Sequence, residues 1–220
     1  MSPAGARSGL ATQTLSRPMR SDAQKNRERL LVAASQVFEE KGLEASVAEV
    51  AQAAGVGMGT LYRRFPSKDA LVEALVSDVL EATIAMAEEA ASCPDGTGLE
   101  HFLRAVSAYH AEHLGCLPKL WNSHHAVQAA RRQIAVRLAD LLADAQAHSR
   151  IRADLTNTDL SLVMWSIKGV LETTGSNAPE AWKRHLDLLL AGMRPTETAL
   201  PHRPLSQSQV DRILSKRDAS

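Results

Sequence analysis

The sequence predicts an all-α chain in which a small N-terminal helix-turn-helix unit precedes a larger helical region. Alanine and leucine dominate the apolar residues and recur three and four positions apart, the spacing of one helix face. Aromatic residues make up only 4% of the chain, and the alternating β-branched pattern of strands is missing. With 220 residues, the chain is long enough for one domain or two small ones.

The first 20 residues contain no acidic side chain and include Arg7, Arg17 and Arg20. Their Pro, Gly and Ser content predicts a disordered basic arm, followed by a first helix over about 22–41. A basic arm beside a helix-turn-helix can reach an adjacent minor groove. A leader without function explains Arg7 equally well.

The second predicted helix begins at residue 46. Ser46 and Glu49 have the spacing of a capping box, in which each side chain satisfies a backbone N–H at a helix start. Gly55 then supplies the left-handed conformation that ends a helix in a tight turn. The helix is therefore only about two turns long.

The third predicted helix spans Met58 to Phe65, with Leu61 and Phe65 facing inward. Its outward side combines small residues, a hydroxyl, a phenol and two guanidinium groups. Such a surface can approach a major groove, read base edges and neutralise phosphates. The predicted DNA contacts on this helix are Met58, Gly59, Thr60, Tyr62, Arg63 and Arg64.

Lys68 follows a plausible N-cap, Ser67, and so lies in the first turn of the next helix. The helix dipole disfavours a cation there, and a residue that breaks a local rule is a candidate for function. We predict a phosphate contact from Lys68, the alternative being a solvated surface lysine. Ser46 adds a second predicted phosphate contact at its own helix start.

Residues 22–72 resemble the DNA-binding domain of the TetR/AcrR family of one-component bacterial regulators. The resemblance rests on the apolar spacing of the first helix and on motifs that follow it, namely Val47, Val50, Ala51, Ala54-Gly55-Val56, Gly59-Thr60-Leu61-Tyr62, Phe65 and Lys68 to Leu71. Gly57 departs from the pattern, since many members carry Ser or Thr there. The recognition helix loses a side-chain cap, at a cost of a few tenths of a kcal/mol.

The resemblance implies a homodimeric transcription regulator on a palindromic DNA operator, and we expect a repressor released by a small-molecule effector. An activator or a ligand-independent DNA-binding protein is the alternative. An enzyme is less favoured, because the sequence offers no convincing nucleophile–base pair or metal cluster. We expect no cofactor.

The chain is predicted to divide into an arm, a reader, a helical sensor and a polar tail. The tail is expected to be loose, although residues 209–214 could form a short docked helix. The basic arm is expected over residues 1–20 and the helix-turn-helix domain that reads DNA over 21–67. The sensor, a helical domain for effector binding and dimerisation, is expected over 68–195, and the tail over 196–220. Helices in the sensor are expected at about 68–92, 99–114, 125–148, 158–174 and 179–192, with a short segment at 117–122.

The last two sensor helices are the predicted dimer interface, because the corresponding helices of the family pair as a four-helix bundle. The sequence alone would also permit them to be core. The predicted interface residues are Leu160, Val163, Ser166, Gly169, Val170, Trp182, Leu186 and Leu189.

A mostly apolar cavity with a few polar groups is the usual form of a small-molecule site. The candidate ligand contacts are Phe102, Tyr109, His110, His113, Trp121, His125, Met164 and Trp165. Packing of the core is the alternative for each of them. His110 and His113 lie three apart, but no Cys or carboxylate joins them at a recognised spacing, so no metal site is predicted.

The formal net charge is zero, but residues 1–70 hold 10 basic and 7 acidic side chains, which leaves the remainder with 15 and 18. The basic excess lies in the first 70 residues, which include the predicted DNA-binding domain, and so has the sign expected for a DNA-binding protein. Cys93 and Cys116 lack CxxC spacing, which favours a reduced cytoplasmic protein over a redox pair. No apolar run reaches the roughly 18 residues of a membrane span.

Overall fold

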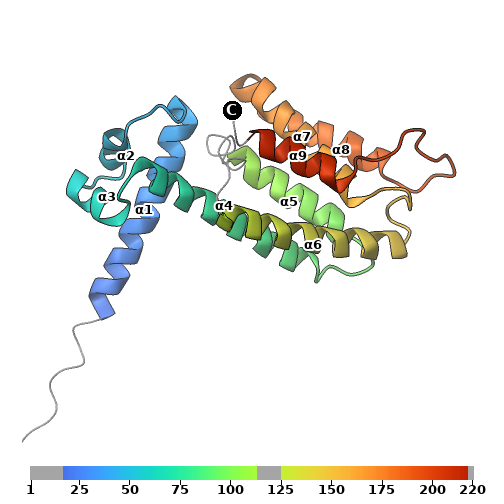
Figure 1. Cartoon of the computed structure of the whole chain (residues 1–220), viewed down its shortest axis with the longest axis horizontal. Coiled ribbons are helices and arrows are strands. Elements are labelled where there is room, and N and C mark those ends of the chain that lie inside the picture. The colour runs from blue at the N-terminus through green and yellow to red at the C-terminus, as the bar shows by residue number, and fades with distance from the viewer. Residues whose placement is uncertain (1–16, 113–124, 218–220) are drawn as a thin grey trace, which may run out of the picture.

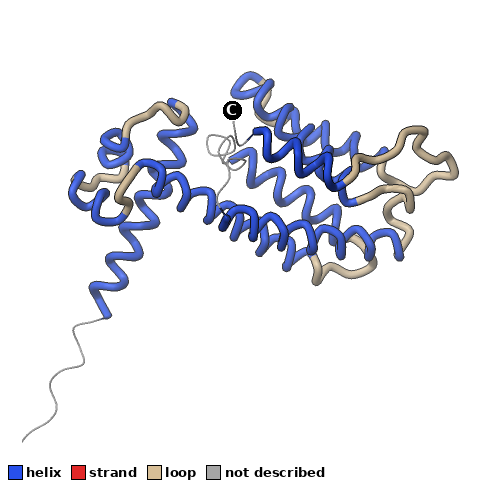
Figure 2. Tube along the Cα trace, in the orientation of Figure 1, coloured by secondary structure: helices blue, strands red, loops and turns tan. Residues whose placement is uncertain are grey.

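A computed structural model describes residues 17–112 and 125–217, and within these ranges all regular structure is helical (Figures 1 and 2). The helices are α1 (Arg17–Lys41), α2 (Val47–Ala53), α3 (Met58–Arg64), α4 (Lys68–Ala90), α5 (Gly98–Glu112), α6 (His125–Ala147), α7 (Asn157–Thr174), the 3₁₀ helix η2 (Gly175–Asn177), α8 (Ala181–Gly192) and α9 (Gln207–Arg217).

The N-terminal unit consists of α1, α2, α3 and the first half of α4, and its core is continuous. Leu30, Phe38, Val50, Leu61 and Leu71 are buried there, one or more from each helix. Figure 1 shows α2 and α3 at the end of the molecule that lies away from α5 to α9. The short helices α2 and α3 are therefore free to meet a large partner.

The C-terminal unit packs the second half of α4, α6, α7 and α8 around α5, with a second buried cluster at its centre. Gly98 lets the start of α5 approach the end of α4, because a Cβ there would lie 2.4 Å from the Ala90 carbonyl oxygen. The two units are not separated by a flexible linker. Tyr109 of α5 and Ile134 of α6 pack against the N-terminal core along α4.

The N-terminal end of the described chain differs from the sequence prediction. α1 begins at Arg17, so residues 17–20 extend the first helix instead of belonging to the arm. The tail contains α9, in agreement with the short docked helix that the sequence allowed over 209–214, and Val210 on that helix is only 4% exposed. A strap of residues 194–206, defined here as the C-terminal strap, connects α8 to α9. The predicted segment 117–122 lies outside the described residues.

Candidate DNA interface

The start of α2 is fixed by the predicted capping box. The Ser46 N–H and hydroxyl donate to Glu49 Oε2 at 2.8 and 2.9 Å, and the Glu49 N–H donates to Ser46 Oγ at 3.3 Å. Lys41 Nζ donates to Glu49 Oε1 at 2.8 Å. The hydrogen bond from Lys41, followed by those from Ser46, lowers the pKa of Glu49 to about 2. To donate to a phosphate, the Ser46 hydroxyl would have to give up its hydrogen bond to Glu49 Oε2.

The turn between α2 and α3 has the predicted left-handed glycine, Gly55, with φ of +65°. Arg29 of α1 donates to the Ala54 carbonyl oxygen at 2.9 Å. This bond satisfies a carbonyl that the end of a short helix would otherwise leave without a partner. Arg29 thus connects the end of α2 to α1.

The recognition helix α3 is anchored by one side and exposed on the other. Leu61 and, just after the helix, Phe65 are buried, as predicted. Gly59, Arg63 and Arg64 are exposed, Thr60 is half-buried, and the side chains of Met58 and Tyr62 are 38% and 47% exposed. Gly57 at the N-cap makes no side-chain hydrogen bond, as expected for glycine. The predicted contact residues of α3 are thus exposed or half-buried, while the residues predicted to face inward are buried.

Lys68 completes this surface at the N-terminus of α4. The predicted cap is present, since Ser67 Oγ accepts a hydrogen bond from the Ala70 N–H at 3.0 Å. Lys68 is half-buried, and its Nζ lies 5.9 Å from the centroid of the Phe38 ring. Contact with this buried ring of α1 restricts the lysine side chain.

The candidate ligand residues that the structure describes divide between the two cores. Phe102 is buried in the core of the C-terminal unit, whereas Tyr109 packs against the N-terminal core. Met164 packs against the C-terminal core, and His110 and Trp165 are half-buried. His113 and Trp121 lie outside the described residues, as does the side chain of His125. A shallow depression of about 470 Å³ between α1 and α2 is lined by other residues, among them Glu28 and Val32.

Four of the predicted interface residues belong to the core of their own chain. These four are Leu160, Val163, Trp182 and Leu186. In the single chain they lie on the inward sides of α7 and α8, which pack against α5, α6 and each other, as the alternative of core packing requires. Ser166, Val170 and Leu189 are half-buried and Gly169 is exposed.

The sequence analysis missed three polar contacts that shape the chain. Arg29 to Ala54, Arg27 to Asp78 at 3.2 Å, and Arg152 to Asp154 each join segments or fix a loop. Only the last pair is close in sequence, so an Arg-x-Asp spacing was the one local signal available. The other two connect α1 to residues 25 and 51 positions away.

Among the described residues, no group of three His, Cys, Asp or Glu side chains is placed to hold a metal ion. Cys93 is half-buried with a free thiol, and Cys116 lies outside the described ranges. Within the same ranges, every helix is too short or too polar to cross a membrane.

Two family models match the chain over most of its folded length. Residues 30–75 match the model of bacterial regulatory proteins of the tetR family. Residues 94–195 match the C-terminal domain of SbtR-like transcriptional regulators. The first match covers the helix-turn-helix, and the second ends just after α8, before the C-terminal strap and α9.

Solved structures resemble the chain over nearly their whole length. A TetR transcription regulatory protein from Mycobacterium vanbaalenii is 31% identical, with 80% of this chain and 99% of that chain covered and a TM-score of 0.58. A TetR transcriptional regulator from Streptomyces coelicolor is 33% identical, with coverage of 77% and 99% and a TM-score of 0.58. An HTH-type transcriptional regulator of Staphylococcus aureus (strain USA300) is 46% identical over 54 residues. That match spans 24% of this chain and 29% of the relative.

A helix-turn-helix with an exposed basic second helix, joined to a larger helical unit, defines a DNA-binding transcription regulator and not an enzyme. The sequence and fold comparisons agree with that class. The chain belongs to the TetR family of transcriptional regulators.

Proposed function

We propose that the chain is a homodimeric repressor that acts in the cytoplasm, binds a palindromic operator through α3 and the start of α4, and is released by a small molecule. The observation that carries the DNA-binding part is the exposed side of α3. Met58 and Tyr62 are exposed beside Arg63, while the buried Leu61 holds the helix in place. Large exposed side chains next to cations suit a groove lined by base edges and phosphates.

The residues of this surface divide into two roles. Met58, Gly59, Thr60 and Arg63 lie on the part of α3 that enters the major groove and read base edges. Tyr62, Arg64 and Lys68 contact phosphates on either side of it. Phosphate contacts fix the register of the protein and carry no sequence information directly. Substitutions in the first group therefore alter sequence preference, and those in the second weaken binding to all duplexes alike.

The dimer forms through the outward sides of α7 and α8. Leu162 and Leu188 are 44% and 57% exposed, although large apolar side chains at exposed helix positions gain from burial. His185 Nε2 and Ser166 Oγ lie 3.0 Å apart and join the two helices at this surface. A Cβ on Gly169 would meet nothing within 4 Å, so another helix can approach closely there.

A two-fold dimer places its two α3 helices in successive major grooves, roughly 34–36 Å apart. α4 connects each α3 to the C-terminal unit, and Tyr109, Ala130 and Ile134 pack against the same core as α3. The effector binds in the C-terminal unit and shifts α5 and α6 along α4. The distance between the two α3 helices then no longer matches the operator. The difference between the effector's affinities for the DNA-binding state and the released state sets how far the equilibrium between those states moves.

Selection from a pool of random duplexes, at two salt concentrations, tests the proposal. A palindromic motif retained at the higher salt is the expected result. Binding without sequence preference that disappears with salt would contradict an operator-specific dimer. A thermal-shift screen then tests the effector, because a ligand that binds only the folded state raises the melting temperature. Expression of a reporter behind the selected operator separates repression from activation.

A further inference from the structure

Met58 is a large apolar side chain to which the rest of the chain gives little cover. It is 38% exposed. Within the described residues it packs against neither buried cluster, whereas Val56, two positions earlier, packs against the N-terminal core. A lone exposed apolar residue is common on protein surfaces, so only its surroundings can assign it a role.

Glycines stand on both sides of Met58, and the fold of this chain requires neither of them. Gly57, the N-cap of α3, has φ of −73° and ψ of 152°, an extended conformation that any residue adopts. A Cβ added to Gly57 or to Gly59 would meet nothing within 4 Å. Gly59 also destabilises a helix of only seven residues, because glycine is less favourable than alanine inside a helix. What the two glycines provide is open space beside Met58, in which the backbone of α3 can approach a partner closely.

Met58 is the first residue of α3, the second helix of the helix-turn-helix. The N-terminal residues of a recognition helix are the ones that contact base edges in the major groove. Tyr62 follows four residues later on the same side of α3 and is 47% exposed. The cations of α3, Arg63 and Arg64, lie in its last turn. In the proposed complex with DNA, Met58 therefore meets the bases with an apolar surface and not with a charge.

The chemistry of methionine restricts what it can recognise on a base. Its side chain has no N–H or O–H group, and its sulfur is only a weak acceptor. It therefore cannot make the paired hydrogen bonds by which Arg reads guanine or Asn and Gln read adenine. The apolar feature that the major groove offers is the C5-methyl group of thymine, and a cytosine methylated at C5 carries the same group. A flexible, unbranched thioether adapts its shape to such a methyl group.

We propose that Met58 determines sequence specificity by packing against the C5-methyl group of one pyrimidine in each operator half-site. The inference rests on the proposed function and deepens it, since it names the base feature that α3 reads. Gly57 and Gly59 leave room for the base beside the methionine. Thymine supplies the methyl group in unmodified DNA, and 5-methylcytosine supplies it in methylated DNA.

Uracil substitution in the selected operator tests this contact, because uracil lacks only the C5-methyl group of thymine. Each thymine of the motif is replaced by uracil, one symmetric pair at a time, and fluorescence anisotropy gives the affinities of the wild type and of Met58→Ala. At one pair, uracil should weaken wild-type binding about fourfold for each half-site, the effect of losing one buried methyl group, and leave Met58→Ala unaffected. If no uracil pair weakened the wild type more than Met58→Ala, the inference would be overturned.

Cytosine at the same position distinguishes the two sources of the methyl group. The wild type should bind a duplex with 5-methylcytosine there more tightly than one with cytosine, again about fourfold for each half-site. Met58→Ala should bind both duplexes equally. Tighter binding to 5-methylcytosine supports recognition of the methyl group on either base. A uracil effect without a 5-methylcytosine effect supports the contact with thymine alone.

A matched control separates base reading from a general loss of binding. Val136→Ala removes another exposed apolar side chain, 62% exposed on α6, and should keep the full uracil effect. A uracil effect that Val136→Ala abolished as completely as Met58→Ala would overturn the inference. Far-UV circular dichroism checks that both variants keep their helices. Selection that returns no motif would instead refute the proposed operator binding, whereas a motif without coupling between a thymine and Met58 overturns the inference alone.

Discussion

Replacing Lys68 with alanine removes one ammonium group from the start of each α4 and tests the phosphate contact. In the structure, Lys68 Nζ lies 5.9 Å from the Phe38 ring centroid. Such a contact is worth about 0.5–1 kcal/mol, and a lysine in a first turn costs about 0.3–1 kcal/mol against the helix dipole. Because the two effects nearly cancel, we expect the free energy of unfolding to change by less than about 0.5 kcal/mol.

DNA binding should respond much more strongly than stability. A dimer has two copies of Lys68, so the variant loses two phosphate contacts. Each contact contributes about 0.9 to the slope of log affinity against log salt concentration. The magnitude of that slope should therefore fall by about 1.8. The loss of affinity should be the same for operator and unrelated duplexes, since phosphates carry no sequence information.

Fluorescence anisotropy with a labelled operator, at salt concentrations from about 0.05 to about 0.2 M, measures the slope. Arg137→Ala is the matched control, because it removes one positive charge from α6, where Arg137 Nη2 pairs with Glu88 Oε1 at 2.8 Å. The control should keep the wild-type slope. A wild-type slope for Lys68→Ala, or an altered sequence preference, would refute the phosphate assignment.

Four further predictions follow from the structure. Gly59→Ala should raise the melting temperature slightly, since a Cβ at this position meets nothing within 4 Å. The same substitution should weaken operator binding, because the added methyl group keeps α3 away from the bases. An unchanged operator affinity in fluorescence anisotropy would argue against a close approach of α3 to the bases. Gly98→Ala should lower stability by about 1–3 kcal/mol in urea unfolding, because the Cβ would lie 2.4 Å from a backbone oxygen, and wild-type stability would show that this crossing can relax. Leu188→Asp should leave circular dichroism unchanged but give monomers in sedimentation, because the side chain is 57% exposed; a stable dimer would place the interface elsewhere. Glu49 has its pKa lowered from 4.5 to about 2, so its contribution to stability is complete above pH 4.5 and is lost as the pH falls toward 2. Urea unfolding of Glu49→Gln should therefore depend less on pH in that window than the wild type does, and an equal dependence would contradict the role of this carboxylate.

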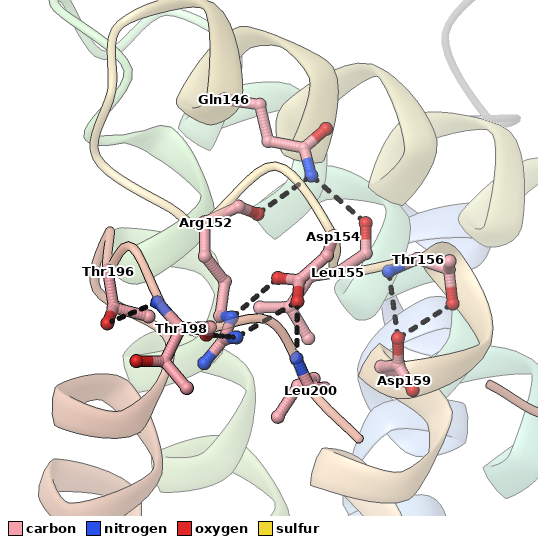
Figure 3. Close-up of polar contacts among 9 residues, drawn as sticks. All are labelled: Gln146, Arg152, Asp154, Leu155, Thr156, Asp159, Thr196, Thr198 and Leu200. Atoms are coloured by element: carbon pink, nitrogen blue, oxygen red, sulfur yellow. Dashed lines mark hydrogen bonds and ion pairs between the residues drawn. The ribbon is translucent and has the colours of Figure 1, made fainter. Parts of the chain in front are cut away.

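Features set by neighbouring residues were predicted well. The Ser46–Glu49 capping box, the positive φ of Gly55 and the inward Leu61 are all present in the structure. The cap at the start of α7 is set equally locally, because the Thr156 N–H and hydroxyl both donate to Asp159 Oδ2 (Figure 3). Each of these depends on hydrogen bonds or rotations within about one helical turn, which the local sequence specifies.

Features set by distant residues were predicted poorly. Leu160 and Leu186 were assigned to a dimer interface because an apolar helix position looks the same whether it faces its own core or a partner. The tail beyond residue 195 was expected to be loose apart from a short docked helix that residues 209–214 could form, since its sequence is polar and the attachment of the strap depends on Arg152. The guanidinium of Arg152 meets the Thr198 carbonyl oxygen across 46 residues of sequence.

The sequence by itself determined that this chain is helical, where most helices begin and end, and which side chains of α3 are proposed to bind DNA. These properties arise from interactions between residues one to four positions apart. Only the tertiary structure decided which sides of α7 and α8 are buried, how α5 and α6 contact the N-terminal core, and where α9 docks. These outcomes depend on the relative packing of whole helices, because a helix buries whichever apolar side its distant neighbours can cover.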